Sequence, residues 1–221
     1  MNQASIFLLS KKGRKYEFTD FPKDLYIDTC FWNEVYGVGN ISFRTNCADF
    51  LIDCAGNDTA FYTSGVVHEE LMHVIKNSMI KEYAYSHNIK VHRYKDNSIN
   101  MKKLFESVYN SFPNIVQDID SEIKRIRNII DEKTYFLEHI NNEEFIDDVN
   151  KLIASTNYQI NTADAKHVLI AHYNEINSFA TLDGDFWMLD NANIYAPPLD
   201  FYNINRLGRR NTFLKYDSNI I

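Results

Sequence analysis

Cysteine is scarce in this chain, and the few cysteines are not spaced for a structural role. Cys30, Cys47 and Cys54 are odd in number and form no CxxC pair. The sequence therefore indicates neither a disulfide framework nor a zinc knuckle. The simplest setting for such thiols is the reducing cytoplasm.

Proline and long apolar runs are also sparse. Four prolines, together with 45% hydrophobic and 14% aromatic residues, argue against disorder and are typical of a chain that buries a substantial core. The opening stretch MNQASIFLLSKKGRK has too short an apolar run and the wrong order of charges for a signal peptide. No later segment approaches the length of a membrane span. We expect a soluble, cytoplasmic protein with no membrane partner.

Positive charge is in deficit, with a formal net charge of −7. This balance argues against a protein that coats nucleic acid through bulk electrostatic attraction. Local basic patches can still bind phosphates. An acidic protein can also cut nucleic acids if its carboxylates hold a metal ion.

Two aspartates follow apolar runs that are typical of buried strands. Residues 25–27 predict a strand that ends at Asp28, with Thr29 as the cap of a short helix, and SFATLD predicts a strand with Asp183 at its carboxyl end. The alternation of strands and helices along the chain predicts an α/β fold with a parallel sheet flanked by helices. Ligands of such sheets gather beyond the carboxyl ends of the strands. We therefore expect Asp28 and Asp183 at one edge.

Two further acids are predicted on helices that lead to the same edge. The run AFYTS predicts a strand, and the helix that Ser64 opens carries Glu70 on its apolar stripe while Glu69 faces away. A carboxylate facing the core is costly unless a positive group meets it. The stretch TADAKHVLIAHY predicts a helix capped by Thr162, with Asp164 in its first turn, where the helix dipole favours the ionised form.

Four carboxylates are thus expected to converge: Asp28, Glu70, Asp164 and Asp183. Crowded negative charges repel one another and raise some of their pKa values, and a divalent cation relieves that repulsion. All-oxygen ligation without Cys or His indicates Mg²⁺ or Mn²⁺ rather than zinc. Such ions support hydrolysis of phosphodiesters. Each acid alone also has a structural explanation, as a turn cap, a helix-start residue or the partner of a core Arg or Lys.

At these residues the sequence resembles the PIN-domain family of metal-dependent nucleases. The matching pieces, in order, are LYIDTCFW, TSGVVHEELMHVI, TADAKHVLIA and ATLDGDF, which fall in residues 24–80 and 155–200. The resemblance implies a single PIN-like domain over residues 1–221 in which the four acids are the catalytic, metal-binding set. It further implies Asp185 as a fifth acid and Thr29 and Thr181 as supporting hydroxyls.

Members of this family are commonly endoribonucleases, and many are toxins of bacterial toxin–antitoxin pairs. The resemblance therefore implies an RNA substrate and, for a toxin, an antitoxin partner. The interval from Glu70 to Asp164 is longer than a minimal PIN domain needs. We expect an extended helical insertion at about residues 101–155, where the sequence reads as almost wholly helical. It would serve substrate selection, dimerisation or inhibitor binding.

The apolar stripe from Ile115 to Ile140 has two interpretations, helix-on-helix packing or a groove for a partner. A non-catalytic adaptor that binds a protein through the helical insertion is accordingly one alternative to the ribonuclease. A DNA nuclease acting on flaps or single strands is another.

The remaining predictions concern the ends of the chain and two further strands. The runs SIFLL and KYEF predict a hairpin with a basic tip that includes Lys12 and Arg14. The tip is either a solvated turn or a contact to a phosphate backbone. The basic extension at about residues 203–221, which includes Arg209 and Arg210, either follows a phosphate backbone or is disordered. KVHRY predicts a strand, and NIYAPP a last edge strand broken by prolines.

Overall fold

The main sheet is built from six parallel strands. A computed structural model of the chain describes residues 4–9, 11–12, 15–16, 18–37, 43–139 and 141–197. The strands follow the hydrogen-bonded order β1-β8-β7-β4-β5-β6. Their bounds are β1 (Ser5–Leu8), β4 (Asp24–Ile27), β5 (Ala60–Ser64), β6 (Tyr135–Leu137), β7 (Ser178–Ala180) and β8 (Asn193–Ala196). The α/β class predicted from the sequence is confirmed.

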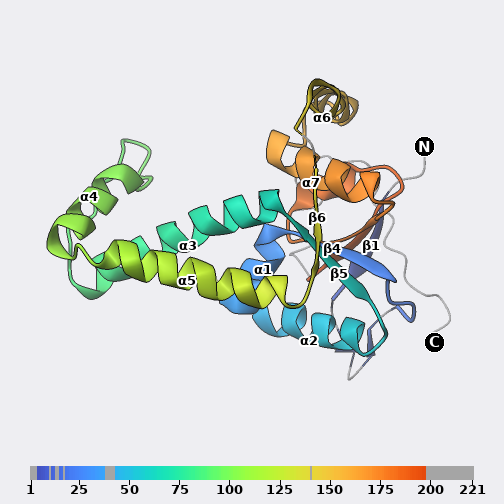
Figure 1. Cartoon of the computed structure of the whole chain (residues 1–221), viewed down its shortest axis with the longest axis horizontal. Helices are drawn as coiled ribbons and strands as arrows, with labels where there is room; N and C mark the ends of the chain where they lie inside the picture. Colours follow the sequence, from blue (N-terminus) through green and yellow to red (C-terminus); the bar gives the residue numbers. More distant parts are fainter. Residues whose placement is uncertain are drawn as a thin grey trace.

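Helices connect the strands and cover the sheet. They are α1 (Thr29–Tyr36), α2 (Arg44–Ala55), α3 (Gly65–Ser86), α4 (Met101–Ser111), α5 (Ile115–Asp131), α6 (Glu143–Ser155), α7 (Thr162–Tyr173) and the short 3-10 helix η1 (Gly184–Met188). In Figure 1, α6 and α7 lie above the sheet and α2 lies below it. Within the described part of the chain, no helix has the length and apolar composition that crossing a bilayer requires.

The strand order reverses beside β4, and this reversal positions the site. Strands β5 and β6 follow on one side of β4, whereas β7 and β8 lie on the other, with Ile27 paired to Ala180. In an open α/β sheet such a reversal leaves a crevice at the carboxyl ends of the two strands, because their connections leave in opposite directions. The residues that follow β4 and β7, Asp28 and Thr181, flank this crevice.

The central strands are buried on both faces. The side chains of Leu25, Tyr26 and Ile27 in β4 have an exposed fraction of 0%, as does that of Phe179 in β7. Continuous burial of this kind is typical of a parallel sheet covered by helices. Packing on both faces therefore holds the carboxyl end of β4, and the residues that follow it, in place.

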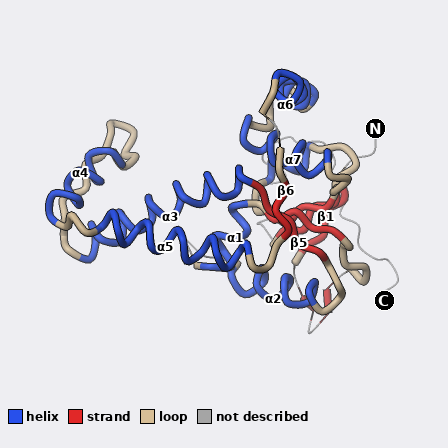
Figure 2. Tube along the Cα trace, in the orientation of Figure 1, coloured by secondary structure: helices blue, strands red, loops and turns tan. Residues whose placement is uncertain are grey.

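An arm of helices extends away from the sheet. The outer part of α3, the whole of α4 and the first part of α5 form it (residues 76–123, called the arm below), with α4 at its far end (Figures 1 and 2). The arm has a hydrophobic cluster of its own, which consists of Ile80, Ala84, Leu104, Val108, Ile115 and Ile119. Ile126 and Ile130 of α5 are buried as well. This burial supports helix packing, rather than a partner groove, as the role of the apolar stripe.

The prediction of an almost wholly helical segment at 101–155 is wrong in one place. Tyr135–Leu137 forms β6, which pairs with β5 and adds an edge strand to the sheet. Its run of aromatic and apolar residues fits a strand, and Leu137 therefore belongs to the sheet and not to the stripe of α5. Ile140 lies outside the described residues. That the segment is an insertion into a smaller domain stays a prediction.

Two other strand predictions are wrong. KVHRY forms no strand, and only Arg93 makes an isolated bridge to Ile99. This segment lies in the arm, where no sheet edge is within reach (Figure 2). Strand β8 lies between β1 and β7 and is therefore interior rather than at the edge. Pro197 follows the end of β8, so its missing N–H removes nothing from the ladder.

The N-terminal hairpin is present in a reduced form. β2 (Lys11–Lys12) pairs with β3 (Lys15–Tyr16) in an antiparallel arrangement. β1 does not take part, because it pairs in parallel with β8. Arg14, the side chain of Lys12, and the C-terminal extension with Arg209 and Arg210 lie outside what the structure describes.

Replacing Leu104 with Ala tests whether the arm has its own core. Leu104 is fully buried in the cluster of the arm, so we expect the variant to lose about 2–4 kcal/mol of packing free energy. The amides of α4 should then exchange with solvent faster while those of β4 change little, as measured by hydrogen exchange. Tyr109→Ala, at an exposed position of the same helix, is the control. Equal acceleration in β4 would contradict a separate cluster.

Candidate metal centre

Asp28 is held at the junction of β4 and α1. Its backbone is extended (φ −72°, ψ 158°), and its Oδ1 accepts a hydrogen bond of 2.6 Å from the Thr29 N–H. Asp28 is therefore the N-cap of α1, and the prediction that Thr29 caps this helix is wrong. A carboxylate in the residue before the helix already satisfies the first N–H. Thr29 itself is buried.

The second oxygen of Asp28 is oriented by two neighbours. Its Oδ2 accepts hydrogen bonds of 2.8 Å from the Thr181 hydroxyl and the Cys30 thiol. Burial, with the nearby charge of Asp28, raises the pKa of the Cys30 thiol well above its ordinary value, so the thiol stays protonated and can donate. The exposed fraction of Asp28 is 4%. Its carboxylate is thus fixed in direction before any ligand arrives.

Thr181 also connects β7 to the acids that follow it. Its Oγ1 accepts from the Asp183 N–H at 2.9 Å, and Asp183 caps η1 by accepting from the Asp185 N–H at 2.8 Å. β7 ends at Ala180, so Asp183 lies on the turn after the strand and not at its last residue. The turn carries Asp183 and Asp185 toward the first turn of α7.

Asp164 lies in the first turn of α7, as predicted. The cap of this helix is Asn161, whose side chain accepts from the N–H groups of Ala163 and Asp164, and the prediction of Thr162 as the cap is wrong. Asp164 has an exposed fraction of 7%, and among the described residues its Oδ2 is buried without a hydrogen-bond partner. Burying a carboxylate oxygen costs free energy unless a cation or a hydrogen-bond donor contacts it.

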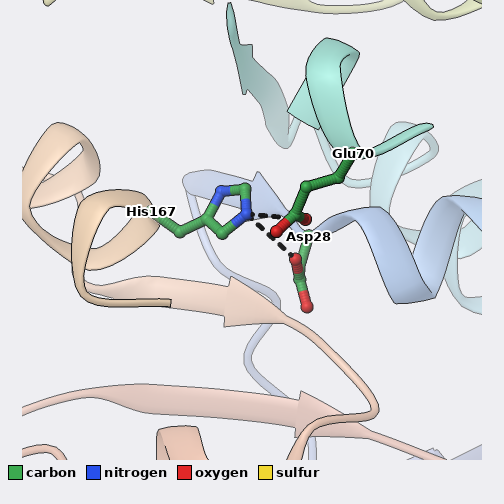
Figure 3. A group of neighbouring side chains, drawn as sticks. All are labelled: Asp28, Glu70 and His167. Atoms are coloured by element: carbon green, nitrogen blue, oxygen red, sulfur yellow. Dashed lines mark hydrogen bonds and ion pairs between the residues drawn. The ribbon is translucent and has the colours of Figure 1, made fainter. Parts of the chain in front are cut away.

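Glu70 faces the same place from α3. Its neighbour Glu69 is exposed, whereas Glu70 is part-buried, as its place on the apolar stripe predicts. Glu70 contacts His167 of α7. The Nε2 atom of His167 lies 3.1 Å from Glu70 Oε2 and 3.6 Å from Asp28 Oδ1. Figure 3 shows the ring pointing at both carboxylates.

Sequence reasoning missed His167. The expectation of all-oxygen ligation did not include this histidine, which is fully buried and lies between the two acids. Its Nδ1 is 2.7 Å from the Tyr26 hydroxyl, which in turn is 2.7 Å from the Ser64 hydroxyl. A signal was present, because Asp164 and His167 are three residues apart and share one side of a helix.

The charges of the site shift several pKa values. Burial, followed by the charges of Asp183 and Asp28, raises the pKa of Asp164 to about 7. Burial acts to raise the pKa of Glu70, but the hydrogen bond and charge of His167 outweigh it and the pKa is lowered. Burial likewise acts to lower the pKa of His167, and the hydrogen bond to Glu70 with the nearby acids raises it instead.

The ligand atoms form two neighbouring groups. Asp28, Glu70 and His167 make one, and Asp164, Asp183 and Asp185 make the other, with one ligand atom per residue lying within 4.8 Å of the others in its group. The second group offers oxygen alone, which suits Mg²⁺ or Mn²⁺. The first adds an imidazole, which binds Mn²⁺ better than Mg²⁺. The partnerless oxygen of Asp164 fits a cation, because among the described residues no donor meets it.

Comparison of the sequence with protein-family models finds no match, and comparison with curated proteins finds none either. Fold and site together therefore define the chain as an α/β protein with an acidic centre at the carboxyl edge of its sheet.

Proposed function

We propose that this chain is a metal-dependent endoribonuclease of the PIN type, which hydrolyses RNA phosphodiester bonds with Mg²⁺ or Mn²⁺. The observation that carries the proposal is the buried, partnerless oxygen of Asp164, next to the acids that flank the reversal point of the sheet. Burial, together with the charges of the neighbouring carboxylates, raises the pKa of Asp164, so the ionised form of this residue is unfavourable without a cation. Bound divalent ions offset that repulsion.

The residues of the chain have distinct tasks in this proposal. Asp28, Glu70 and His167 would hold one ion, and Asp164, Asp183 and Asp185 would hold a second. When bound, these ions activate a water molecule and stabilise the charge that develops on the phosphate. Thr181 and Cys30 orient Asp28, while Tyr26 holds the His167 ring through Nδ1. Such supporting contacts fix the direction of the ligands.

A cleavage assay tests the proposal. Purified protein is incubated with labelled single-stranded RNA and with a DNA of matched sequence, in Mn²⁺, in Mg²⁺ and in EDTA. We expect cleavage of RNA that needs the metal and is faster with Mn²⁺. Preferential cleavage of the DNA would favour the alternative of a DNA nuclease. Cleavage that persists unchanged in EDTA would contradict the proposal.

His167 gives a prediction that separates metal binding from the overall fold. His167→Gln removes the imidazole between Glu70 and Asp28, so we expect the affinity for Mn²⁺ to fall about 10–100-fold. Calorimetric titration measures this change. His172→Gln, at an exposed position of the same helix, is the matched control and should bind as the wild type does. Unchanged affinity in the His167 variant would contradict its role at the site.

The roles of toxin and of homodimer are further proposals that depend on the nuclease. A small adjoining reading frame with a DNA-binding motif would support a toxin with an antitoxin partner. The non-catalytic adaptor is tested best by surface substitutions. Deleting residues 101–155 would also remove β6 and the buried part of α5, so loss of a partner after that deletion would not separate binding from folding.

A further inference from the structure

The far end of the arm carries positive charge in an acidic chain. Residues 87–112, called the tip below, contain five Lys and Arg against two Asp and Glu, whereas the whole chain has a net charge of −7. All five cations are exposed: Lys90, Arg93, Lys95, Lys102 and Lys103. The tip is therefore a local basic patch of the kind that binds phosphates in an otherwise acidic protein.

These cations differ from those of α5 in their ion pairing. Lys124, Arg125 and Arg127 each pair with an acid on their own helix. Among the residues that the structure describes, none of the five cations of the tip forms such a pair, although Arg93 donates to the Asn97 carbonyl. Charge on α5 is largely neutralised locally, and charge at the tip remains available to a ligand.

The backbone of α4 adds to this positive potential. Asn100 caps α4 by accepting from the Lys103 N–H, so Lys102 and Lys103 lie in the first turn of the helix. The amino end of a helix is itself positive, and two lysines there reinforce an attraction for anions. α4 is held in place by the cluster of the arm and by Lys76, whose Nζ lies 5.1 Å from the centre of the Phe105 ring.

Exposed aromatic rings accompany the charge. Tyr94 has an exposed fraction of 56%, and Tyr85 and Tyr109 are exposed as well. Tyr94 belongs to a turn closed by hydrogen bonds to Ser98 and Asn97. Surfaces that bind single-stranded nucleic acid usually combine cations, which contact the phosphates, with exposed aromatic rings, which stack on the bases.

One helix connects the tip to the candidate metal centre. α3 carries Glu70 near its start and continues to Ser86 at the beginning of the tip. At 1.5 Å per residue that separation is about 24 Å. We propose that the tip of the arm binds the phosphate backbone of the RNA substrate at a distance from the cleavage site. This inference rests on the proposed function and adds the means by which a long substrate is held.

A binding experiment in EDTA tests the tip without requiring cleavage. The probe is a fluorescein-labelled uridine strand of about 30 nucleotides, which is long enough to span the distance at roughly 3 Å or more per nucleotide. The tip variant is Lys90→Gln, Lys102→Gln and Lys103→Gln together. The matched control is Lys124→Gln, Arg125→Gln and Arg127→Gln, which removes the same charge from cations that are already paired. Thermal melting establishes that both variants are folded.

We expect the tip variant to bind the uridine strand about tenfold more weakly at low salt, with a shallower dependence of affinity on salt, because fewer counterions are released. Tyr94→Ala should weaken binding about fivefold or more through lost stacking. The control variant should bind as the wild type does. If the tip variant binds like the wild type, or if the control loses as much, the inference is overturned, and the tip is then a surface for another partner or only a contributor to net charge.

Failure of this inference differs from failure of the proposed function. The tip variant should cleave a uridine strand of about four nucleotides as fast as the wild type, since so short a strand does not reach the tip. Absence of metal-dependent cleavage in the wild type would count against the proposed function alone. Intact cleavage together with unchanged binding of the long strand by the tip variant would count against the tip alone.

Discussion

Replacing Asp28 with Asn should lower the rate of RNA cleavage by about 100-fold or more, which corresponds to roughly 3 kcal/mol of transition-state stabilisation. The substitution keeps the size of the side chain but removes its negative charge. An amide also cannot accept from the Thr29 N–H, the Thr181 hydroxyl and the Cys30 thiol at once, as Asp28 does. The orientation of the group is therefore lost together with its charge.

The control for this variant is Asp120→Asn, which removes one acid from an exposed position of α5. Its cleavage rate should equal that of the wild type. Initial rates at saturating Mn²⁺, with melting curves for both variants, provide the comparison. A folded Asp28→Asn protein that cleaves RNA at the wild-type rate would rule out Asp28 as part of the centre.

Replacing Asp164 with Asn should stabilise the metal-free protein at pH 8 and should reduce the stabilisation that Mn²⁺ confers. The pKa of Asp164 is raised to about 7 by burial and by the nearby acids. At pH 8 the folded protein therefore holds an ionised carboxylate in a place that disfavours it. Removing that charge should increase the free energy of unfolding by about 2–4 kcal/mol, because each unit of pKa shift corresponds to about 1.4 kcal/mol.

The dependence on pH follows from the sign of this shift. The folded pKa of Asp164 lies above the ordinary value of 3.8, so between about pH 4 and 7 the folded state binds more protons at this residue than the unfolded state. The contribution of Asp164 to stability thus falls as pH rises through this window. The difference in stability between Asp164→Asn and the wild type should grow from near zero at pH 4 to its full value above pH 7.

Urea denaturation in EDTA at several pH values measures this difference. Asp190→Asn changes an exposed acid, so the stability of this control should track that of the wild type throughout. Mn²⁺ binding should weaken below pH 7, because protons compete for the same carboxylate. A variant of Asp164 that is less stable than the wild type at pH 8 would contradict the account of a repulsive, metal-free site.

The sequence predicted the parts of the fold that depend on local patterns. The strands ending before Asp28 and at Ser64, and the helix carrying Asp164, were correctly placed because strand and helix periodicity act over a few residues. β6 was missed because three residues are too few for a periodic signal, and its pairing with β5 is a tertiary contact. Helix caps were misplaced by one residue where two candidate caps are adjacent, as at Asn161 and Thr162.

The site was predictable in part for a similar reason. Acids after strands and in first turns can be identified from position alone, and the structure brings them to one edge of the sheet. The sequence offered only a weak signal for His167, its position three residues after Asp164 on the same helix. Its role depends on Tyr26 and Glu70, which come from other elements. The available positive charge at the tip of the arm could not be predicted either. Only the folded helices show which acids pair with the cations of α5.

The most direct test of the account is a calorimetric titration of Mn²⁺ into the metal-free protein at pH 8. The account predicts Mn²⁺ uptake by both groups of ligands in the wild type. Asp28→Asn should lose the ion of the Asp28 group and Asp164→Asn the ion of the Asp164 group, while Asp190→Asn binds normally. A wild-type protein that takes up no Mn²⁺, or variants of Asp28 and Asp164 that bind it as tightly as the wild type, would contradict the claim that these acids gather around a cation.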